Sequence, residues 1–213
     1  NLFQDIAGRH AESLGIGFLP LLKRGYYWVL TRNMYEVVSP LLTADDLVVS
    51  TWPHVPSGFD FTREYEIHDA QGNLLIKGLS KWLILSLDTH QIQRSRVVSY
   101  GEGKHLDRSN FRDCLSKLDA FDLIHTPTIY KTNIKYHQVD HNGHMNNVAY
   151  VTEITNAMKF SKEQHIQHFE INYLGEMYLD DPLEIRSARV NEGIAIEGYK
   201  DSTIKVRAFI TLA

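Results

Sequence analysis

The chain has few of the features that define disulfide-stabilised, membrane-spanning or nucleic-acid-binding proteins. Its 213 residues include one cysteine, Cys114, which excludes an intramolecular disulfide and is compatible with a reducing compartment. The longest apolar runs, such as WLILSL interrupted by Ser86, are far too short to span a bilayer. Lys and Arg total 22 against 26 Asp and Glu, a formal net charge of -4. The composition therefore gives no electrostatic reason to expect binding to nucleic acid or to an anionic membrane.

What remains is ordinary globular composition, with 43% hydrophobic and 23% charged residues. A chain of this length can bury one sizeable core or two smaller ones. The sequence begins at Asn1, without Met and within a helical pattern. We therefore expect further residues ahead of it in the full protein, and any targeting peptide would lie among them.

The first half combines one helical pattern with a series of strand patterns. Apolar residues recur at helical spacing from Leu2 to Leu14, and Gly15 and Gly17 end the run. Strand patterns follow at residues 26–38, 45–53 and 59–86, the last with a turn at 70–73. Residues 97–125 are polar and irregular, which predicts a long connection with room for one short helix. This stretch is the best candidate for an inter-domain linker.

The second half repeats this order. A short strand is expected at 129–137, then a helix, then strands at 168–173, 182–190, 194–200 and 204–212. The predicted apolar face of the helix consists of Val148, Val151, Ile154, Ala157 and Met158. In the last strand Ile204 and Val206 should face one way, and Lys205 and Arg207 the other. A helix followed by antiparallel strands, twice, predicts an α+β fold with each helix on one face of a sheet.

The stretch VDHNGHMNNVAY, Val139 to Tyr150, gathers polar residues immediately before the second helix. Asn146 or Asn147 is well placed to cap that helix, but one cap needs only one residue. His137, His141 and His144 have spacings of four and three, which would place them on one face of a metal-binding helix. Gly143 and the asparagines instead indicate a turn, where this spacing gives no common face.

A third interpretation is a hydrolytic site at the start of the helix. Free N–H groups and the helix dipole there suit an oxyanion or a polarised carbonyl. Asn142 could donate a hydrogen bond, Asp140 could orient a neighbour, and His144 could move a proton near neutral pH. No serine stands in a nucleophile-elbow pattern, and Cys114 lies in the predicted linker. Water activated by a carboxylate or a histidine is then the expected nucleophile.

The sequence VDHNGHMNNVAYV resembles the Asp-x-Asn-x-His-x-Asn-Asn-x-x-Tyr signature of the acyl-acyl carrier protein (acyl-ACP) thioesterases of plants and their bacterial relatives. WVLTRNMYEV, FTREYEI and SKWLILSLDT also fall in the order expected of that family's first half, so the resemblance covers nearly the whole chain. GHMNN alone is shared more loosely among hotdog-fold proteins. The resemblance implies a double (tandem) hotdog, in which each long central helix is wrapped by an antiparallel sheet. The implied domains are an N-terminal hotdog at 1–96 lacking its first strand, a linker at 97–125 and a C-terminal hotdog at 126–213 that carries the catalytic residues.

When the family's catalytic residues are carried over position by position, the resemblance assigns catalytic roles to Asp140, Asn142 and His144. It also assigns one to Glu176, in NYLGEM. From its residue type alone, Glu176 would be a solvated side chain. Plant members have a cysteine at the position of Met177, so a cysteine nucleophile is excluded here. Asn142 and backbone N–H groups would hold the carbonyl oxygen, His144 and Glu176 would activate water or shuttle protons, and Asp140 would orient Asn142 and His144. Direct carboxylate attack, giving an anhydride, is the alternative.

The implied activity is hydrolysis of fatty acyl-ACP to free fatty acid and holo-ACP in fatty acid biosynthesis, with no cofactor and no metal. The alternatives are a hotdog acyl-CoA thioesterase and a non-catalytic acyl-thioester-binding protein. The expected partner is acyl carrier protein, docked by a basic patch for which Lys23, Arg24 and Arg32 are candidates; no nucleic acid or membrane is expected, and a homodimer is left open. The expected location is the bacterial cytoplasm, or the plastid for a plant protein. The sequence does not predict the preferred acyl chain length.

Overall fold

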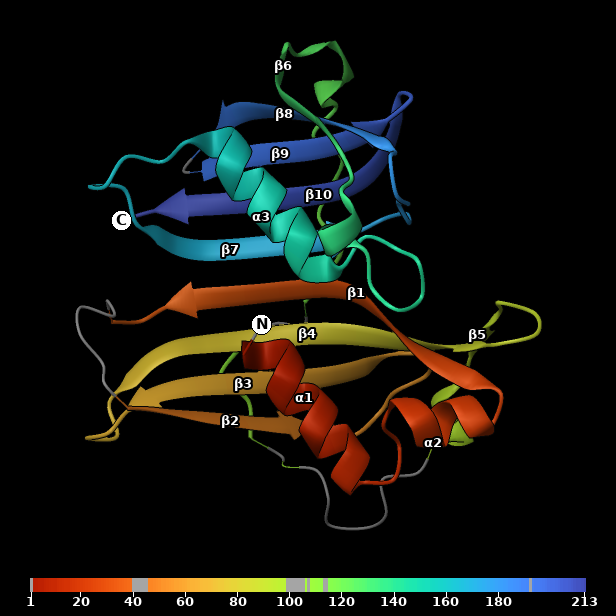
Figure 1. Cartoon of the computed structure of the whole chain (residues 1–213). Coiled ribbons are helices and arrows are strands. Elements are labelled where there is room, and N and C mark those ends of the chain that lie inside the picture. Colours follow the sequence, from red (N-terminus) through yellow and green to blue (C-terminus); the bar gives the residue numbers. More distant parts are fainter. Residues whose placement is uncertain (1, 40–45, 99–105, 107, 113–114, 192) are drawn as a thin grey trace. The chain divides into compact units, whose positions relative to one another are not determined.

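The structure is a computed structural model that describes residues 2–39, 46–98, 106, 108–112, 115–191 and 193–213. The chain divides into two compact units, unit 1 (Asn1–Leu115) and unit 2 (Ser116–Ala213) (Figure 1). This division falls inside the expected linker, and the domain boundaries drawn from the sequence stay predictions. Cys114 lies outside the described residues.

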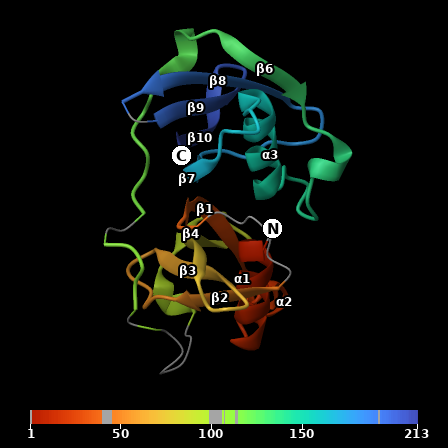
Figure 2. The same ribbon diagram turned by 90° about the vertical axis from the view of Figure 1, so that its left-hand side faces the viewer.

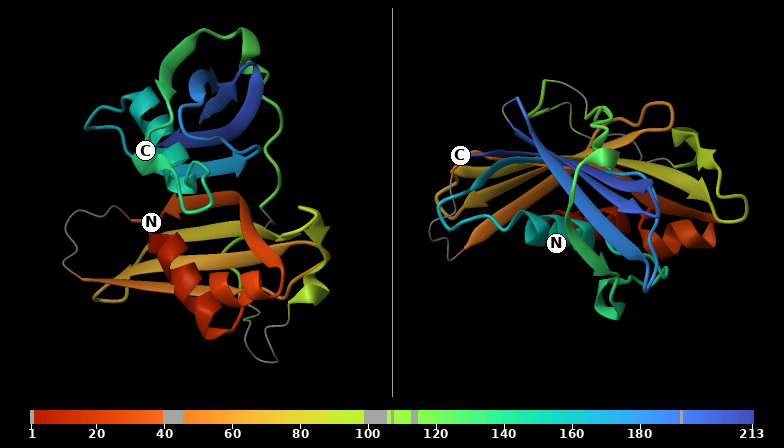
Figure 3. Two further views of the ribbon diagram at one scale, coloured as in Figure 1. Left: turned by 45° about the vertical axis from the view of Figure 1, so that its right-hand side comes forward. Right: turned by 90° about the horizontal axis from the view of Figure 1, so that it is seen from above.

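Unit 1 is an antiparallel sheet with helices on one face. Its elements are α1 (Leu2–Ser13), α2 (Phe18–Lys23), β1 (Tyr26–Val37), β2 (Leu47–Pro53), β3 (Phe61–Asp69), β4 (Leu74–Ser86), β5 (Ile92–Gln93) and the 3₁₀ turn η1 (Ser95–Val97). The strand order is β2-β3-β4-β1, and β5 pairs with β4. The expected helix and the long strands are confirmed, whereas α2 was not anticipated. The helix α1 crosses the sheet (Figure 3).

The contact between α1 and its sheet depends on a glycine in the middle of a strand. The ring of Phe3 stacks on that of Tyr65, with ring centroids 4.4 Å apart. Tyr65 pairs with Gly78 on β4, and a Cβ added at Gly78 would lie 2.2 Å from the Phe3 ring. Glycine weakens a strand interior, but here it makes room for the helix.

Unit 2 has the same arrangement with an additional strand before the helix. Its elements are η2 (Leu123–His125), β6 (Thr128–Asn133), η3 (Tyr136–Gln138), α3 (Asn147–Met158), β7 (Ile166–Tyr173), β8 (Pro182–Val190), β9 (Gly193–Lys200) and β10 (Thr203–Leu212). The antiparallel order is β7-β10-β9-β8-β6, and α3 lies on one face (Figure 2). None of the helices in the described ranges of either unit is long and apolar enough to cross a membrane.

The start of α3 is confirmed, but its buried face differs from the expected one. The side chain of Asn146 caps the helix by accepting the Val148 N–H at 2.9 Å. The buried residues are Ala149, Tyr150, Glu153, Ile154 and Ala157. Val148, expected on the buried face, is only half-buried. The face is rotated because the helix buries Glu153, whose carboxylate accepts hydrogen bonds from Gln138 and from the Tyr130 hydroxyl.

We term the described residues 108–112 and 115–123 the connecting segment. In unit 2, part of this segment covers the sheet face opposite α3 (Figure 2). Glu197 on β9 is fully buried there. It accepts hydrogen bonds from Arg207 Nε at 2.8 Å and from the Leu123 N–H at 3.0 Å. Arg207 faces away from the helix, on the other side of the strand from Val206 as the alternation predicted, but it is only 5% exposed. Alternation indicates the direction of a side chain and not its burial, and here the connecting segment excludes water from that face.

A buried glutamate has the same position in unit 1. Both β3 and β9 are the third strand after the helix of their unit, between equivalent neighbours in the sheet. Glu64 on β3 is fully buried and lies on the face opposite Tyr65 and α1. It accepts hydrogen bonds from His54 Nε2 at 2.7 Å, Ser109 Oγ at 2.6 Å and the Asn110 N–H at 2.8 Å. In each unit, therefore, a buried carboxylate binds the backbone of the connecting segment.

Candidate active site

The polar stretch before α3 forms a loop that closes on Asp140. Its Oδ1 atom accepts the backbone N–H groups of Asn142 at 2.8 Å and His144 at 3.3 Å. The Asp140 N–H donates back to the His144 carbonyl at 2.8 Å, and the Gly143 N–H donates to the Asp140 carbonyl at 3.0 Å. Gly143 has a φ of +80°, a left-handed conformation that glycine adopts without strain. Asp140 thus fixes the backbone of both Asn142 and His144.

The base of this loop is fastened to two other segments of unit 2. The Met145 N–H donates to the Met177 carbonyl at 2.7 Å, and the Asn146 N–H donates to the Gln138 carbonyl at 2.8 Å. Gln138 is itself buried, and its side-chain amide donates to Glu153 of α3. The bond to Met177 brings the loop beside the residues that follow β7, which include Glu176.

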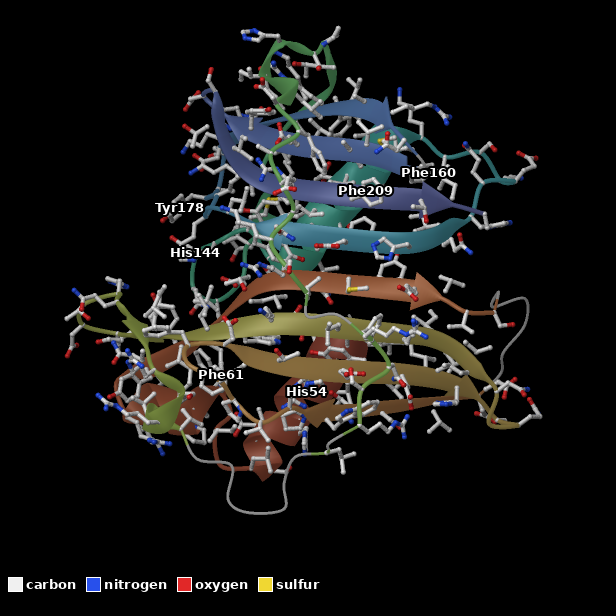
Figure 4. All side chains as sticks on the ribbon, turned by 180° about the vertical axis from the view of Figure 1, so that it is seen from behind. His54, Phe61, His144, Phe160, Tyr178 and Phe209 are labelled. Carbon is white, nitrogen blue, oxygen red and sulfur yellow. The ribbon has the colours of Figure 1, made fainter. Side chains whose placement is uncertain are left out.

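The structure places the side chains of His144 and Glu176 together. His144 Nδ1 lies 3.4 Å from Glu176 Oε1, and the two side chains are 32% and 54% exposed. The hydroxyl of Tyr178 donates to Glu176 Oε2 at 2.9 Å. The rings of Tyr178 and His144 meet edge to face with centroids 5.1 Å apart, and Figure 4 shows the two side chains next to each other. A histidine, a carboxylate and a tyrosine therefore form one contiguous group.

Two buried tyrosines hold the surrounding backbone. The Tyr150 hydroxyl donates to the Gly175 carbonyl at 3.1 Å, and the Tyr173 hydroxyl donates to the Asn147 carbonyl at 3.2 Å. Burial raises the pKa of Tyr173, and burial together with the negative charge of Glu176 raises the pKa of Tyr150. Both phenols stay protonated at neutral pH and act as structural donors.

Asn142 is connected to Asp140 only through its backbone N–H. Its side chain is exposed, and among the described residues its amide makes no hydrogen bond to Asp140, His144 or Glu176. The backbone N–H groups of residues 142–146 already have acceptors within unit 2. This restricts the donors available for a substrate oxygen, because the N–H groups just ahead of α3 are occupied.

The histidines considered as metal ligands do not form a site. His137 and His141 are exposed, whereas His144 contacts Glu176. Within the described part of the chain, no group of three or more His, Cys, Asp or Glu side chains could hold a metal ion.

Sequence reasoning missed three residues that support the site. Gln138 and Glu153 were unassigned because neither belongs to the family motif, although a glutamate amid apolar helical positions is a signal of burial with a partner. Tyr178 lies two residues after Glu176, and this closeness in sequence is the feature that could have identified it as part of the site. Met177, between them, is fully buried.

Replacing Gly143 with alanine should destabilise the loop and the activity together. Gly143 and Gly72, in the turn between β3 and β4, have φ values of +80° and +84°, and a Cβ at either would meet no atom within 4 Å. Each alanine variant should therefore lose a similar stability, about 1–2 kcal/mol, from backbone strain. Gly143→Ala should also lower kcat/KM at least about tenfold by displacing the loop, whereas Gly72→Ala should retain activity. Denaturant unfolding and a thioesterase assay measure both effects. Equal activity of the two variants would contradict the assignment of this loop.

Comparison with known proteins identifies related sequences along nearly the whole chain. The acyl-ACP thioesterase N-terminal domain matches residues 1–97, and the acyl-ACP thioesterase C-terminal domain matches residues 122–209. An oleoyl-acyl carrier protein thioesterase of Coriandrum sativum, described as chloroplastic, is 24% identical in an alignment of 216 positions that covers 92% of this chain and 58% of the relative. An oleoyl-acyl carrier protein thioesterase 2 of Arabidopsis thaliana is 24% identical over 85% of this chain and 54% of its own length. The chain thus spans somewhat more than half the length of these curated relatives.

Solved structures of similar fold include two thioesterases. The acyl-ACP thioesterase from Bacteroides thetaiotaomicron has a TM-score of 0.85 at 22% identity, covering 99% of this chain and 86% of that one. The 12:0-ACP thioesterase from Umbellularia californica has a TM-score of 0.84 at 21% identity, with the same coverage. These similarities show the expected α+β hotdog fold. Because both domains of one family match in order, the chain belongs to the acyl-ACP thioesterase family.

Proposed function

We propose that this protein hydrolyses fatty acyl-ACP to a free fatty acid and holo-ACP in fatty acid biosynthesis. The observation that carries the proposal is the contact of His144 Nδ1 with Glu176 Oε1 at 3.4 Å, in a chain of the acyl-ACP thioesterase family. The activity and the substrate are a proposal, since the chain spans 58% of the coriander relative.

In the proposed mechanism His144 is the general base. Because Nδ1 lies 3.4 Å from Glu176 Oε1, Nε2 is the ring nitrogen left to accept a proton from water. The water oxygen bonds to the thioester carbonyl carbon, and the Glu176 carboxylate stabilises the imidazolium that forms. The tetrahedral intermediate then collapses, the C–S bond breaks, and His144 returns the proton to the leaving sulfur.

We propose that the side-chain amide of Asn142 donates a hydrogen bond to the oxyanion that develops on the substrate. The backbone N–H groups of the loop already have acceptors, whereas the Asn142 side chain is exposed. A donor aimed at this charge is worth most when it is held rigidly. Asp140 fixes the backbone from which that side chain extends by accepting the Asn142 N–H, so we propose that it orients the site through the backbone.

The same hydrogen bonds favour water over a carboxylate as the nucleophile. Both oxygens of Glu176 are engaged, one with His144 and one with Tyr178. Asp140 Oδ1 accepts two backbone N–H groups. Glu176, and the Oδ1 atom of Asp140, would have to give up these interactions to attack a carbonyl carbon, so an anhydride formed by these atoms is disfavoured.

The carrier and its docking surface belong to the proposal as well. Of the three basic candidates, Arg32 donates to the Leu115 carbonyl at 3.0 Å and Arg24 donates to the Val97 carbonyl. Lys23 and Arg24 are exposed and could meet an acidic carrier protein. The expected absence of nucleic-acid binding, the homodimer, and the cytoplasmic or plastid location stay predictions.

The test is hydrolysis of one acyl chain presented on ACP and on coenzyme A, across a panel of chain lengths and salt concentrations. We expect kcat/KM to be at least about tenfold higher with acyl-ACP at low salt and to fall as salt rises, because encounter with an acidic carrier is steered electrostatically. Equal or faster hydrolysis of acyl-CoA would favour the acyl-CoA thioesterase. Tight binding of acyl-ACP without turnover would favour the non-catalytic binding protein.

A further inference from the structure

Glu176 stands in a strand-to-turn segment and is more than half exposed, so its carboxylate needs a restraint to stay on His144. An exposed glutamate side chain samples several rotamers of similar energy. The restraint in the structure is Tyr178, whose hydroxyl donates to Oε2 at 2.9 Å while Oε1 faces His144. The two carboxylate oxygens are thus engaged by two different side chains.

Tyr178 is itself fixed by the turn that follows it. Its N–H donates to Asp181 Oδ2 at 2.9 Å, and the Asp181 N–H donates back to its carbonyl at 3.1 Å. Asp181 Oδ1 in turn pairs with the ammonium of Lys200 on β9 at 2.6 Å. The backbone of Tyr178 is therefore fastened to a strand in the interior of the sheet, although its ring is partly exposed.

Tyr178 contacts both members of the proposed catalytic pair. Its hydroxyl binds Glu176, and its ring meets the His144 ring at 89° with centroids 5.1 Å apart, as Figure 4 shows. One side chain thereby limits the movement of the carboxylate and of the imidazole.

We propose that Tyr178 is a positioning residue of this site, which holds Glu176 in the orientation that keeps the proton of His144 on Nδ1. The proposal rests on the proposed function for its catalytic consequence, but not for its geometry. A carboxylate held at Nδ1 fixes the tautomer in which Nε2 is unprotonated and able to act as a base. The hydrogen bond to Glu176, and the charge of that carboxylate, raise the pKa of Tyr178. The phenol therefore remains a donor throughout the neutral range.

The test replaces Tyr178 with phenylalanine, which removes the hydroxyl and retains the ring. We expect kcat to fall about tenfold with KM nearly unchanged, as for the loss of one hydrogen bond to a partly exposed charged group. Tyr136→Phe is the matched control, because Tyr136 lies in the same unit, is 85% exposed and takes no part in the site. It should retain wild-type kcat and KM.

A second measurement reads the geometry without turnover. Nitrogen-15 NMR of the histidine rings should show His144 mainly as the Nδ1–H tautomer in the wild-type protein and in Tyr136→Phe. In Tyr178→Phe the population should shift toward the Nε2–H tautomer. An unchanged tautomer in Tyr178→Phe, or an unchanged kcat in an active enzyme, would overturn the proposal. A tautomer shift in a protein that hydrolyses no thioester would sustain the positioning role and refute the proposed function.

Discussion

Replacing His144 with alanine is expected to lower kcat for acyl-ACP hydrolysis by about 10³-fold, within the range that general acid–base catalysis contributes. The variant removes the group that, in the proposed mechanism, accepts the proton from water and returns it to the leaving sulfur. It should leave the loop in place, because His144 takes part in the loop through its backbone N–H and carbonyl, which alanine retains. Steady-state kinetics with acyl-ACP measure the loss, and far-ultraviolet circular dichroism checks the fold.

His137→Ala is the matched control for that experiment. His137 is exposed in η3, seven residues before His144, and it has no role in the proposed reaction. Its removal should change kcat less than twofold. If His144→Ala folded normally and kept the wild-type rate, or if His137→Ala lost activity equally, the assignment of the general base would be wrong.

Replacing Glu197 with alanine is expected to destabilise unit 2 by about 3–5 kcal/mol, the usual cost of leaving one member of a buried ion pair without its partner. Arg207, only 5% exposed, would lose the carboxylate at 2.8 Å, and the Leu123 N–H would lose its acceptor. Glu184→Ala is the control on the adjacent strand. Glu184 is 30% exposed and pairs with Lys131, which is 67% exposed, and with Arg186, which is 17% exposed. Because water reaches this carboxylate, its removal should cost less than that of Glu197, about 1 kcal/mol. Similar losses in the two variants would contradict this account.

The stabilisation by Glu197 should also depend on pH. Burial alone would raise the pKa of Glu197, but hydrogen bonds from Tyr199, from the Leu123 N–H and from Arg207 outweigh it and hold the pKa below its ordinary value. A carboxyl group with a lowered folded-state pKa stabilises the fold above the ordinary glutamate pKa of about 4.3, and this contribution is lost as pH falls through the folded-state value. The difference between wild type and Glu197→Ala should therefore be constant near neutrality and shrink below about pH 4.

The choice of probe matters for this measurement, because the three tryptophans, Trp28, Trp52 and Trp82, all lie in unit 1. Their fluorescence follows the unfolding of unit 1. Hydrogen exchange of peptides from unit 2, measured by mass spectrometry, follows the unit that the substitution destabilises.

The order of the helices and strands, apart from the short α2, could be predicted because it depends on local chemistry. Asn146 caps α3 through a bond to its own second neighbour, and strand alternation needs only a period of two. Burial could not be predicted in the same way. Arg207 faces the way that alternation predicted, yet it and Asn172 are buried because the distant connecting segment covers their face. The helix α3 likewise buries Glu153 because of Gln138 and Tyr130, which lie outside the helix.

The candidate site could likewise be predicted only in part. The motif supplied Asp140, Asn142 and His144 as sequence neighbours, and the family resemblance supplied Glu176. Spacing could not show that Asp140 binds backbone N–H groups, because that requires the loop to fold back on itself. Nor could it show that Tyr178 reaches both Glu176 and His144, because the orientation of two side chains on a turn depends on the neighbouring loop.

The buried glutamates of the two sheets also determine how the protein carries a mechanical load. The chain leaving unit 1 is fastened to β3 where Glu64 binds Asn110, and the chain entering unit 2 is fastened to β9 where Glu197 binds Phe121 and Leu123. Tension along the connecting segment would act first on the bonds nearer its middle, from Arg32 to the Leu115 carbonyl and from the Leu118 N–H to Asn172 Oδ1. It would act next on the charge-assisted bonds of Glu64 and Glu197, which lie on interior strands paired on both sides, and would reach β5 or β6 only after both sets of bonds had broken.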